Sequence, residues 1–180
     1  MTTSSRLVVL SGCSGGGKST LIEELNRCGF AVVREAGRRL LHDEMAAGGS
    51  ALPWADPTAF LDRILAMSIE DHATATARGG TIFFDRSLID ALSGLEHRTG
   101  QPFLRPLGLT HRYHPTVFLT PPWPGIYVMD DERRHDFAAA EREYHRLRRD
   151  YPALGYDVID LPKAPVAERA DFMLARLDSA

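Results

Sequence analysis

The chain has 180 residues, of which 44% are hydrophobic and 25% are charged, and its formal net charge is −3. These values are ordinary for a globular protein, and we expect one domain over residues 1–180. The slightly acidic balance argues against nucleic acids or acidic membranes as partners. Cys13 and Cys28 are expected to stay reduced, because one lies in a glycine-rich turn and the other ends a helix. With no signal peptide and no apolar run of membrane-spanning length, we expect a cytoplasmic protein.

Short apolar runs alternate with helical patterns along the chain. Strands are predicted at 6–10, 30–33, 81–84, 116–119 and 157–161. Helices are predicted at 20–28, 35–47, 57–78, 88–97, 137–151 and 166–177, with Asp56 as the N-cap of the third. Strands that are apolar throughout and separated by helices favour an α/β fold, with a five-stranded parallel sheet covered on both faces.

A phosphate-binding motif follows the first predicted strand. Residues 12–19 read GCSGGGKS, which matches the P-loop pattern G-x-x-x-x-G-K-[ST]. In such a loop successive backbone N–H groups wrap a polyphosphate, the lysine reaches the terminal phosphates, and the hydroxyl binds magnesium. We therefore expect ATP or GTP and Mg²⁺ here; the alternative is an ordinary strand–helix turn. The predicted nucleotide-binding residues are Gly12, Cys13, Ser14, Gly15, Gly16, Gly17, Lys18, Ser19 and Thr20.

The thiol of Cys13 lies near a helix N-terminus and a lysine. This placement predicts a lowered pKa and a reactive thiol that bound nucleotide protects. The alternative is an inert small residue in a turn.

Phe83-Phe84-Asp85-Arg86-Ser87 closes the third predicted strand. An acid at the carboxyl end of a buried strand is the Walker B position, where Asp85 would hold magnesium together with Ser19. The alternative role for Asp85 is an N-cap of the next helix. Arg86 is predicted to contact a phosphate, with an ordinary surface arginine as the alternative.

Glu35 follows the second predicted strand, so it also lies at a carboxyl end. A carboxylate there could accept the proton of an attacking hydroxyl or water. The alternative is a first-turn acid that interacts with the helix dipole. Arg38 and Arg39 could bind an acceptor or lie on the helix surface.

A proline-rich break at 121–124 precedes an acidic stretch that contains Arg133 and Arg134. We interpret residues 123–136 as a lid whose arginines neutralise charge on a transferring phosphoryl group. The following helix carries further charges, most of which we expect on a solvated face. These are Glu141, Arg142, Glu143, Arg146, Arg148 and Arg149.

Four features of the sequence together resemble one family, and the resemblance covers nearly the whole chain. The features are the P-loop, Glu35-Ala36-Gly37-Arg38, Phe84-Asp85-Arg86, and the Pro-Pro-Trp segment followed by Asp-Asp-x-Arg-Arg. The family comprises small P-loop proteins termed AAA-type ATPases, akin to the ribosylnicotinamide kinase domain of bacterial NAD regulators. The Asp-Arg-Ser element is also similar to that of deoxynucleoside and thymidylate kinases. This resemblance implies that Glu35 acts near the acceptor hydroxyl, that Arg133 and Arg134 cover the phosphates, and that the loop containing Pro162 and Lys163 flanks the purine.

The sequence therefore predicts an ATP-dependent, magnesium-requiring phosphotransferase of the nucleoside or nucleotide kinase type. Its expected partners are a nucleotide and a small-molecule acceptor. The catalytic residues would be Lys18, Glu35, Asp85, Arg86, Arg133 and Arg134. One alternative is a nucleotide-binding switch or slow NTPase that signals to a partner, and a further one is a resistance-type kinase. The acceptor, the choice of ATP or GTP, and the oligomeric state stay open.

Overall fold

The computed structural model describes residues 5–127 and 137–178. Within these ranges five strands form one sheet in the order β2-β3-β1-β4-β5. They are β1 (Arg6–Gly12), β2 (Ala31–Val33), β3 (Thr81–Asp85), β4 (Thr116–Thr120) and β5 (Asp157–Asp160). Every neighbouring pair is parallel, so the predicted sheet is confirmed and the carboxyl ends of all five strands share one edge.

The described helices are α1 (Lys18–Arg27), α2 (Ala36–Ala47), α3 (Pro57–Arg78), α4 (Leu88–Thr99), α5 (Leu104–Thr110), α6 (Phe137–Ala153), α7 (Val166–Asp178) and the 3₁₀ helix η1 (Pro124–Ile126). The sequence did not predict α5 or η1, which are too short to show a helical period. The other predicted elements differ from the observed ones by at most two residues at either end. Within residues 5–127 and 137–178, no helix combines the length and the hydropathy that a membrane span needs.

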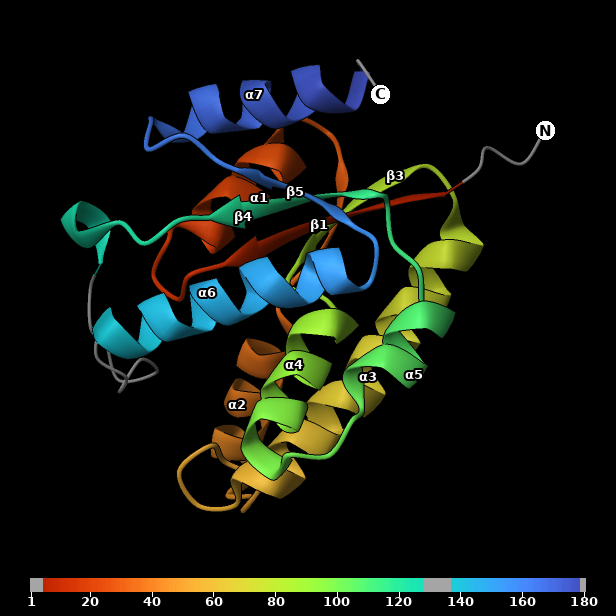
Figure 1. Ribbon diagram of the computed structural model, residues 1–180, viewed down its shortest axis with the longest axis vertical. Coiled ribbons are helices and arrows are strands. Elements are labelled where there is room, and N and C mark those ends of the chain that lie inside the picture. The colour runs from red at the N-terminus through yellow and green to blue at the C-terminus, as the bar shows by residue number, and fades with distance from the viewer. Residues whose placement is uncertain (1–4, 128–136, 179–180) are drawn as a thin grey trace.

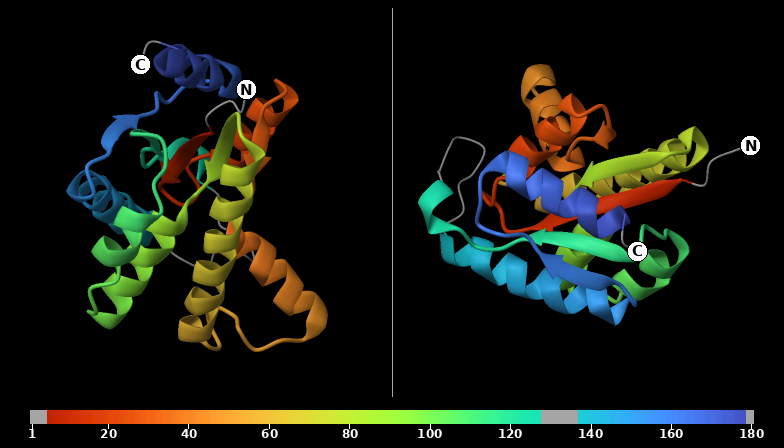
Figure 2. Two further views of the ribbon diagram at one scale, coloured as in Figure 1. Left: turned by 90° about the vertical axis from the view of Figure 1, so that its right-hand side faces the viewer. Right: turned by 90° about the horizontal axis from the view of Figure 1, so that it is seen from above.

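The helices form a layer on each side of the sheet (Figures 1 and 2). Side chains alternate along β1, so Val8 and Leu10 pack under α1 and α7, whereas Leu7 and Val9 pack on the opposite side with α4 and α6. The two hydrophobic clusters formed in this way are buried on both faces of the central strand. This packing holds the carboxyl end of β1 between its neighbours β3 and β4.

The order of the strands marks the place where a ligand can bind. The chain passes from β1 to β2 and β3 on one side, and then to β4 and β5 on the other. In open parallel sheets, ligands bind outside the carboxyl ends at such a reversal. Here that point is the turn after Gly12, where the P-loop begins.

Candidate active site

The P-loop connects β1 to α1 and has little space for side chains. A Cβ at Gly12, where φ is +106°, would lie 2.5 Å from the backbone oxygen of Thr120. At Gly15 a Cβ would lie 2.6 Å from the ring of Tyr127, so the chain just before residue 128 packs on the loop. Helix α1 then starts at Lys18, with its N-terminus toward the loop.

Lys18 is turned back onto the P-loop. Its Nζ donates a hydrogen bond to the backbone oxygen of Cys13 at 2.7 Å, and the side chain is buried. Burial lowers the pKa of Lys18, and the nearby Arg86 lowers it further. The carboxylates near Lys18 compensate its buried positive charge only in part. The negative charge of a bound polyphosphate would complete that compensation.

Ser19 and Asp85 meet at the carboxyl edge of the sheet, as the magnesium prediction requires. The Ser19 hydroxyl donates to Asp85 Oδ2 at 3.0 Å. Among the described residues, Asp85 Oδ1 is buried and has no hydrogen-bond partner. Burial, and then the neighbouring Glu35, raises the pKa of Asp85. A hydroxyl and a buried carboxylate beside a phosphate loop are groups that fit Mg²⁺.

The alternative role of Asp85, as a helix cap, is wrong. Helix α4 is capped by Ser87, whose hydroxyl accepts from the backbone N–H of Ile89. Asp90 completes a capping box by accepting from the backbone N–H of Ser87 at 2.9 Å. This arrangement leaves Asp85 available for other ligands.

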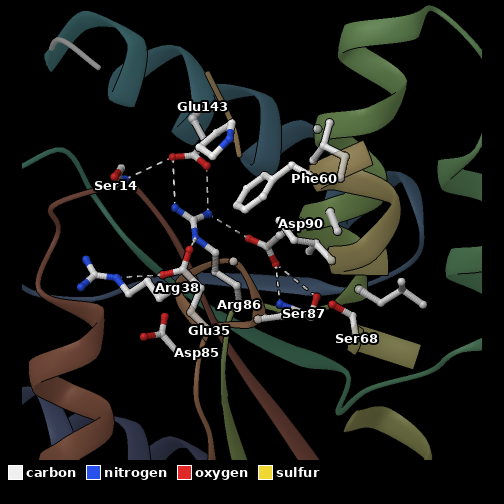
Figure 3. A pocket seen from close by; sticks show the side chains of 18 of the residues that line it. Ser14, Glu35, Arg38, Phe60, Ser68, Asp85, Arg86, Ser87, Asp90 and Glu143 are labelled. Carbon is white, nitrogen blue, oxygen red and sulfur yellow. Dashed lines mark hydrogen bonds and ion pairs between the residues drawn. The ribbon is translucent and has the colours of Figure 1, made fainter. Parts of the chain in front are cut away.

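Arg86 is at the centre of a group of carboxylates (Figure 3). Its guanidinium group lies 3.2 Å from Glu35, 3.3 Å from Asp90 and 2.9 Å from Glu143. Burial by itself lowers the pKa of Arg86, but the surrounding carboxylates outweigh it and raise the pKa well above its usual value. The side chain is only 16% exposed, so the alternative of a surface arginine is wrong.

The backbone of Arg86 is also unusual. It has a φ of +64°, and it is the only non-glycine residue with positive φ in the described ranges. Its N–H donates to the backbone oxygen of Leu10 at 2.9 Å, which links β3 to β1 at this point. Such strain is found where the surroundings hold a functional side chain in place.

Two acids of this group were missed at the level of sequence. Asp90 could have been found, because Ser87-Leu88-Ile89-Asp90 has the spacing of a capping box. The sequence pattern predicts a solvated position for Glu143, but this residue lies three residues after buried Ala140 and four before buried Leu147. That spacing puts it on the buried face of α6.

Glu143 connects α6 to the P-loop. It accepts a hydrogen bond from the backbone N–H of Ser14 at 3.2 Å and another from Arg86 at 3.2 Å. Burial by itself raises the pKa of Glu143, but Arg86 and Lys18 outweigh it and hold the pKa below its usual range. Glu143 therefore brings a negative charge to a loop that is built to bind phosphate.

A cavity of about 570 Å³ opens beside these charged groups. Glu35 lines it as the N-terminal flanking residue of α2, and its side chain forms no cap hydrogen bond. It instead pairs with Arg86 and, at 3.4 Å, with Arg38, which also lines the cavity. Arg39 pairs with Asp71. The cavity walls include both apolar and polar side chains of α3, α4 and α6. Among them are Phe60, Leu61, Ile64, Ser68, Gly94 and Arg146.

The prediction of a reactive thiol at Cys13 is wrong. The side chain is fully buried in the core, and its Sγ donates to the backbone oxygen of Ser14 at 3.1 Å. Burial raises the pKa of the Cys13 thiol, although Lys18 acts in the opposite direction. The residue can serve nucleotide only through its backbone.

The remaining predicted residues lie around the P-loop or outside the described ranges. Arg133 and Arg134 fall within 128–136 and are not described. Pro162 and Lys163 are exposed in the loop between β5 and α7. That loop leaves β5 at the same edge of the sheet as the P-loop.

Arg169 also contacts the P-loop, and the sequence did not predict this contact. Its Nη1 donates to the backbone oxygens of Gly16 and Gly17, each at 3.4 Å, and its guanidinium carbon lies 5.7 Å from the ring of Trp123. Arg169 thus ties α7 to the P-loop and to the start of the predicted lid.

Comparison with known proteins gives a consistent family and fold. A family model described as an AAA domain matches residues 7–169. A search of the curated proteins finds no match. Deoxyadenosine kinase from M. mycoides with bound dATP superposes with a TM-score of 0.60 at 12% identity, over 96% of this chain and 99% of that one.

Two other structures have similar folds. Shikimate kinase from Acinetobacter baumannii in complex with shikimate gives a TM-score of 0.62 at 16% identity, over 97% of this chain and 93% of that one. NadR protein in complex with NR gives 0.70 at 19% identity, over 98% of this chain and 51% of that one. The fold is thus that of the P-loop kinases.

Proposed function

The chain belongs to the AAA domain family, and we propose that it is a magnesium-requiring, ATP-dependent phosphotransferase of the nucleoside or nucleotide kinase type. One observation carries the proposal. Glu35 and Arg86, at the ends of adjacent strands, lie 3.2 Å apart at a cavity of about 570 Å³. A phosphotransferase needs a base and a space for the acceptor beside the phosphate loop, and a nucleotide switch needs neither.

The donor half of the proposed site is the P-loop. Backbone N–H groups of residues 12–20 and the ammonium group of Lys18 would bind the phosphates of ATP. Ser19 and Asp85 would hold Mg²⁺, which when bound neutralises charge on the polyphosphate. Pro162 and Lys163 would flank the base of the nucleotide.

In the proposed reaction an acceptor hydroxyl oxygen attacks the terminal phosphorus of ATP. The bond from that phosphorus to the bridging oxygen breaks, and the bridging oxygen leaves with ADP. Glu35 accepts the proton of the hydroxyl. Lys18 and Arg86, together with Arg133 and Arg134 of the predicted lid, stabilise the negative charge on the transferring group.

The proposal also covers the location, the domain organisation and the partners of the protein. We place the protein in the cytoplasm as one domain over residues 1–180, with a nucleotide and a small hydroxylated compound as its partners. Cys13 and Cys28 are both free thiols, which fits a reducing compartment. The net charge of −3 favours small ligands over nucleic acid.

A screen for ADP release tests the function. The purified protein with ATP and Mg²⁺ is offered nucleosides, nucleotides, ribosylnicotinamide and other hydroxylated compounds. We expect one class of compound to stimulate ADP release strongly and Glu35→Gln to abolish the stimulation. Slow ADP release that no compound stimulates would instead support the switch or slow NTPase. Stimulation by a hydroxylated compound that is not a nucleoside would favour the resistance-type kinase.

Asp85→Asn tests the proposed metal site. The amide keeps the shape of the side chain but removes the charge, so turnover should fall about 100-fold while the melting temperature changes little. The dependence of turnover on magnesium concentration should also shift to higher concentrations. A rate equal to that of the parent protein would exclude Asp85 as a magnesium ligand.

A further inference from the structure

Arg146 is an oriented cation in the wall of the cavity. It lies on α6 one helical turn after Glu143 and lines the same cavity. Its Nε donates to Ser93 Oγ at 2.9 Å, and Ser93 Oγ in turn donates to Asp150 Oδ2 at 2.7 Å. Ser93 and Asp150 are buried, so this chain of hydrogen bonds holds the guanidinium group from one side.

The terminal nitrogens of Arg146 differ from those of Arg38 and Arg86, which also line the cavity. A guanidinium group has five N–H donors, and Arg146 uses only the one on Nε in its hydrogen bonds to the described residues. Arg86, by contrast, is paired with three carboxylates, and Arg38 is paired with Glu35. Arg146 thus lines the cavity while its two NH₂ groups have no hydrogen-bond partner among the described residues.

The half-buried charge of Arg146 is only partly compensated. Burial lowers the pKa of Arg146, although Glu143 and Asp150 act in the opposite direction. No carboxylate of the described residues lies within ion-pair distance of its guanidinium group. The two adjacent NH₂ groups of a half-buried guanidinium group without an ion-pair partner bind carboxylate, phosphate or carbonyl oxygens well.

The position of Arg146 relative to Arg86 is fixed by two packed helices. Asp90 and Ser93 are three residues apart on α4, and Glu143 and Arg146 are three residues apart on α6. The Arg146–Ser93 contact therefore lies roughly 5 Å along both helices from the contacts of Asp90 and Glu143 with Arg86. Arg146 therefore lies about one helical turn from the group of carboxylates around Arg86.

We propose that Arg146 recognises the acceptor by binding a carboxylate or carbonyl oxygen on the end opposite the hydroxyl that is phosphorylated. The inference rests on the proposed function and names the class of compound that it uses. The acceptor places its hydroxyl near Glu35 and its oxygen group on Arg146. Phe60, Leu61 and Ile64 of α3 provide an apolar wall for the body of the molecule.

The test compares acceptors with and without such an oxygen. The probes are shikimate, which has a carboxylate, its methyl ester, which has only a carbonyl, ribosylnicotinamide, which has a carboxamide, and deoxyadenosine, which has none of these groups. We expect phosphoryl transfer to a member of the first three. Arg146→Gln should then raise KM for that compound about 10- to 100-fold while kcat changes less than about 3-fold. Preference between shikimate and its ester separates an anionic oxygen from a neutral carbonyl.

Two variants control the measurement. Arg105→Gln removes the same charge from an exposed position on α5 that does not line the cavity, and it should leave KM unchanged. Ser93→Ala keeps the charge of Arg146 but removes the hydrogen bond that orients it, so KM should rise by a smaller factor. This second variant serves as the test if Arg146→Gln fails to fold.

The failure of the inference is distinguishable from that of the proposed function. If no probe is phosphorylated, calorimetric titration of the same four compounds still measures binding to the cavity. Binding that Arg146→Gln weakens would support the role of Arg146 while removing the kinase assignment. Three outcomes would overturn the inference. Deoxyadenosine could be the best ligand, KM or affinity could be unchanged in Arg146→Gln, or no probe could bind.

Discussion

The phosphate-binding end of the site is built from one short segment of the chain, whereas the acceptor end is assembled from several distant elements. Residues 12–19 form the whole P-loop, from the last residue of β1 into the first turn of α1. The acceptor end joins Glu35 before α2, Arg86 before α4 and Glu143 of α6, and its Arg86–Glu143 contact spans 57 residues of sequence.

The two ends also differ in charge. The P-loop has one buried ammonium group, Lys18, and a run of backbone N–H groups, which suit a polyphosphate. The acceptor end surrounds Arg86 with three carboxylates, which suits a group that takes a proton or binds hydroxyls. Substitutions at the two ends should therefore affect different steps of the proposed reaction.

Lys18→Ala should give the largest loss, because it affects both the binding of the donor and its reaction. We expect most ATP affinity to disappear and turnover to fall about 1,000-fold. The substitution removes a charge rather than core volume, so the melting temperature should change little. Calorimetric titration with ATP and a thermal melt provide the two measurements. A Lys18→Ala protein that binds and uses ATP like the parent would remove the assignment of the P-loop.

Glu35→Gln should act at the acceptor end only. The amide keeps the shape of the side chain but cannot accept the hydroxyl proton, so kcat should fall about 100- to 1,000-fold. The affinity for ATP should stay within about 3-fold of the parent, in contrast to Lys18→Ala. Equal losses of affinity and turnover would mean that Glu35 supports the donor site instead.

The difference between the two ends explains what the sequence could predict. The P-loop depends on local backbone geometry, so its motif located Lys18 and Ser19 directly. The strands and their parallel order followed from apolar runs separated by helices. Asp85 and Glu35 followed from the rule that the ends of parallel strands meet at one edge.

The residues that were missed depend on packing between helices. Glu143, Arg146 and Arg169 each reach the site from a helix that is remote in the sequence, and an arginine-rich helix looks solvated when read alone. The burial of Cys13 was missed for a related reason, because the core of the sheet closes over the start of the P-loop. Long-range packing of this kind leaves little trace in a local pattern.

For the predicted lid, the comparison is between the affinity for ATP and the rate of phosphoryl transfer. If Arg133 and Arg134 act on the transferring group, the double change Arg133→Ala with Arg134→Ala should lower kcat about 100-fold and weaken ATP binding less than about 5-fold. The measurements are the Kd for ATP and kcat with the best acceptor. A loss of affinity that accounts for the whole loss of turnover would favour a nucleotide switch.

Glu143→Gln should have the smallest effect, and it concerns stability where the two ends meet. Glu143 is paired with Arg86 and Ser14, and it faces Lys18 of the P-loop and Arg146 of its own helix. The glutamine loses the charge, so near neutral pH we expect a loss of about 1–3 kcal/mol in the free energy of unfolding. Glu141→Gln, an exposed change on the same helix, should cost much less.

The stability loss in Glu143→Gln should depend on pH. The pKa of Glu143 is lower in the folded protein than its ordinary value of 4.5. Its stabilising contribution is therefore present above that ordinary pKa and disappears as pH falls through the folded pKa. Urea unfolding should thus show a deficit of Glu143→Gln relative to the parent at pH 7 that shrinks as the pH is lowered below about 4.5. A deficit that is the same at neutral and acidic pH would show that the charge of Glu143 does not link α6 to the P-loop.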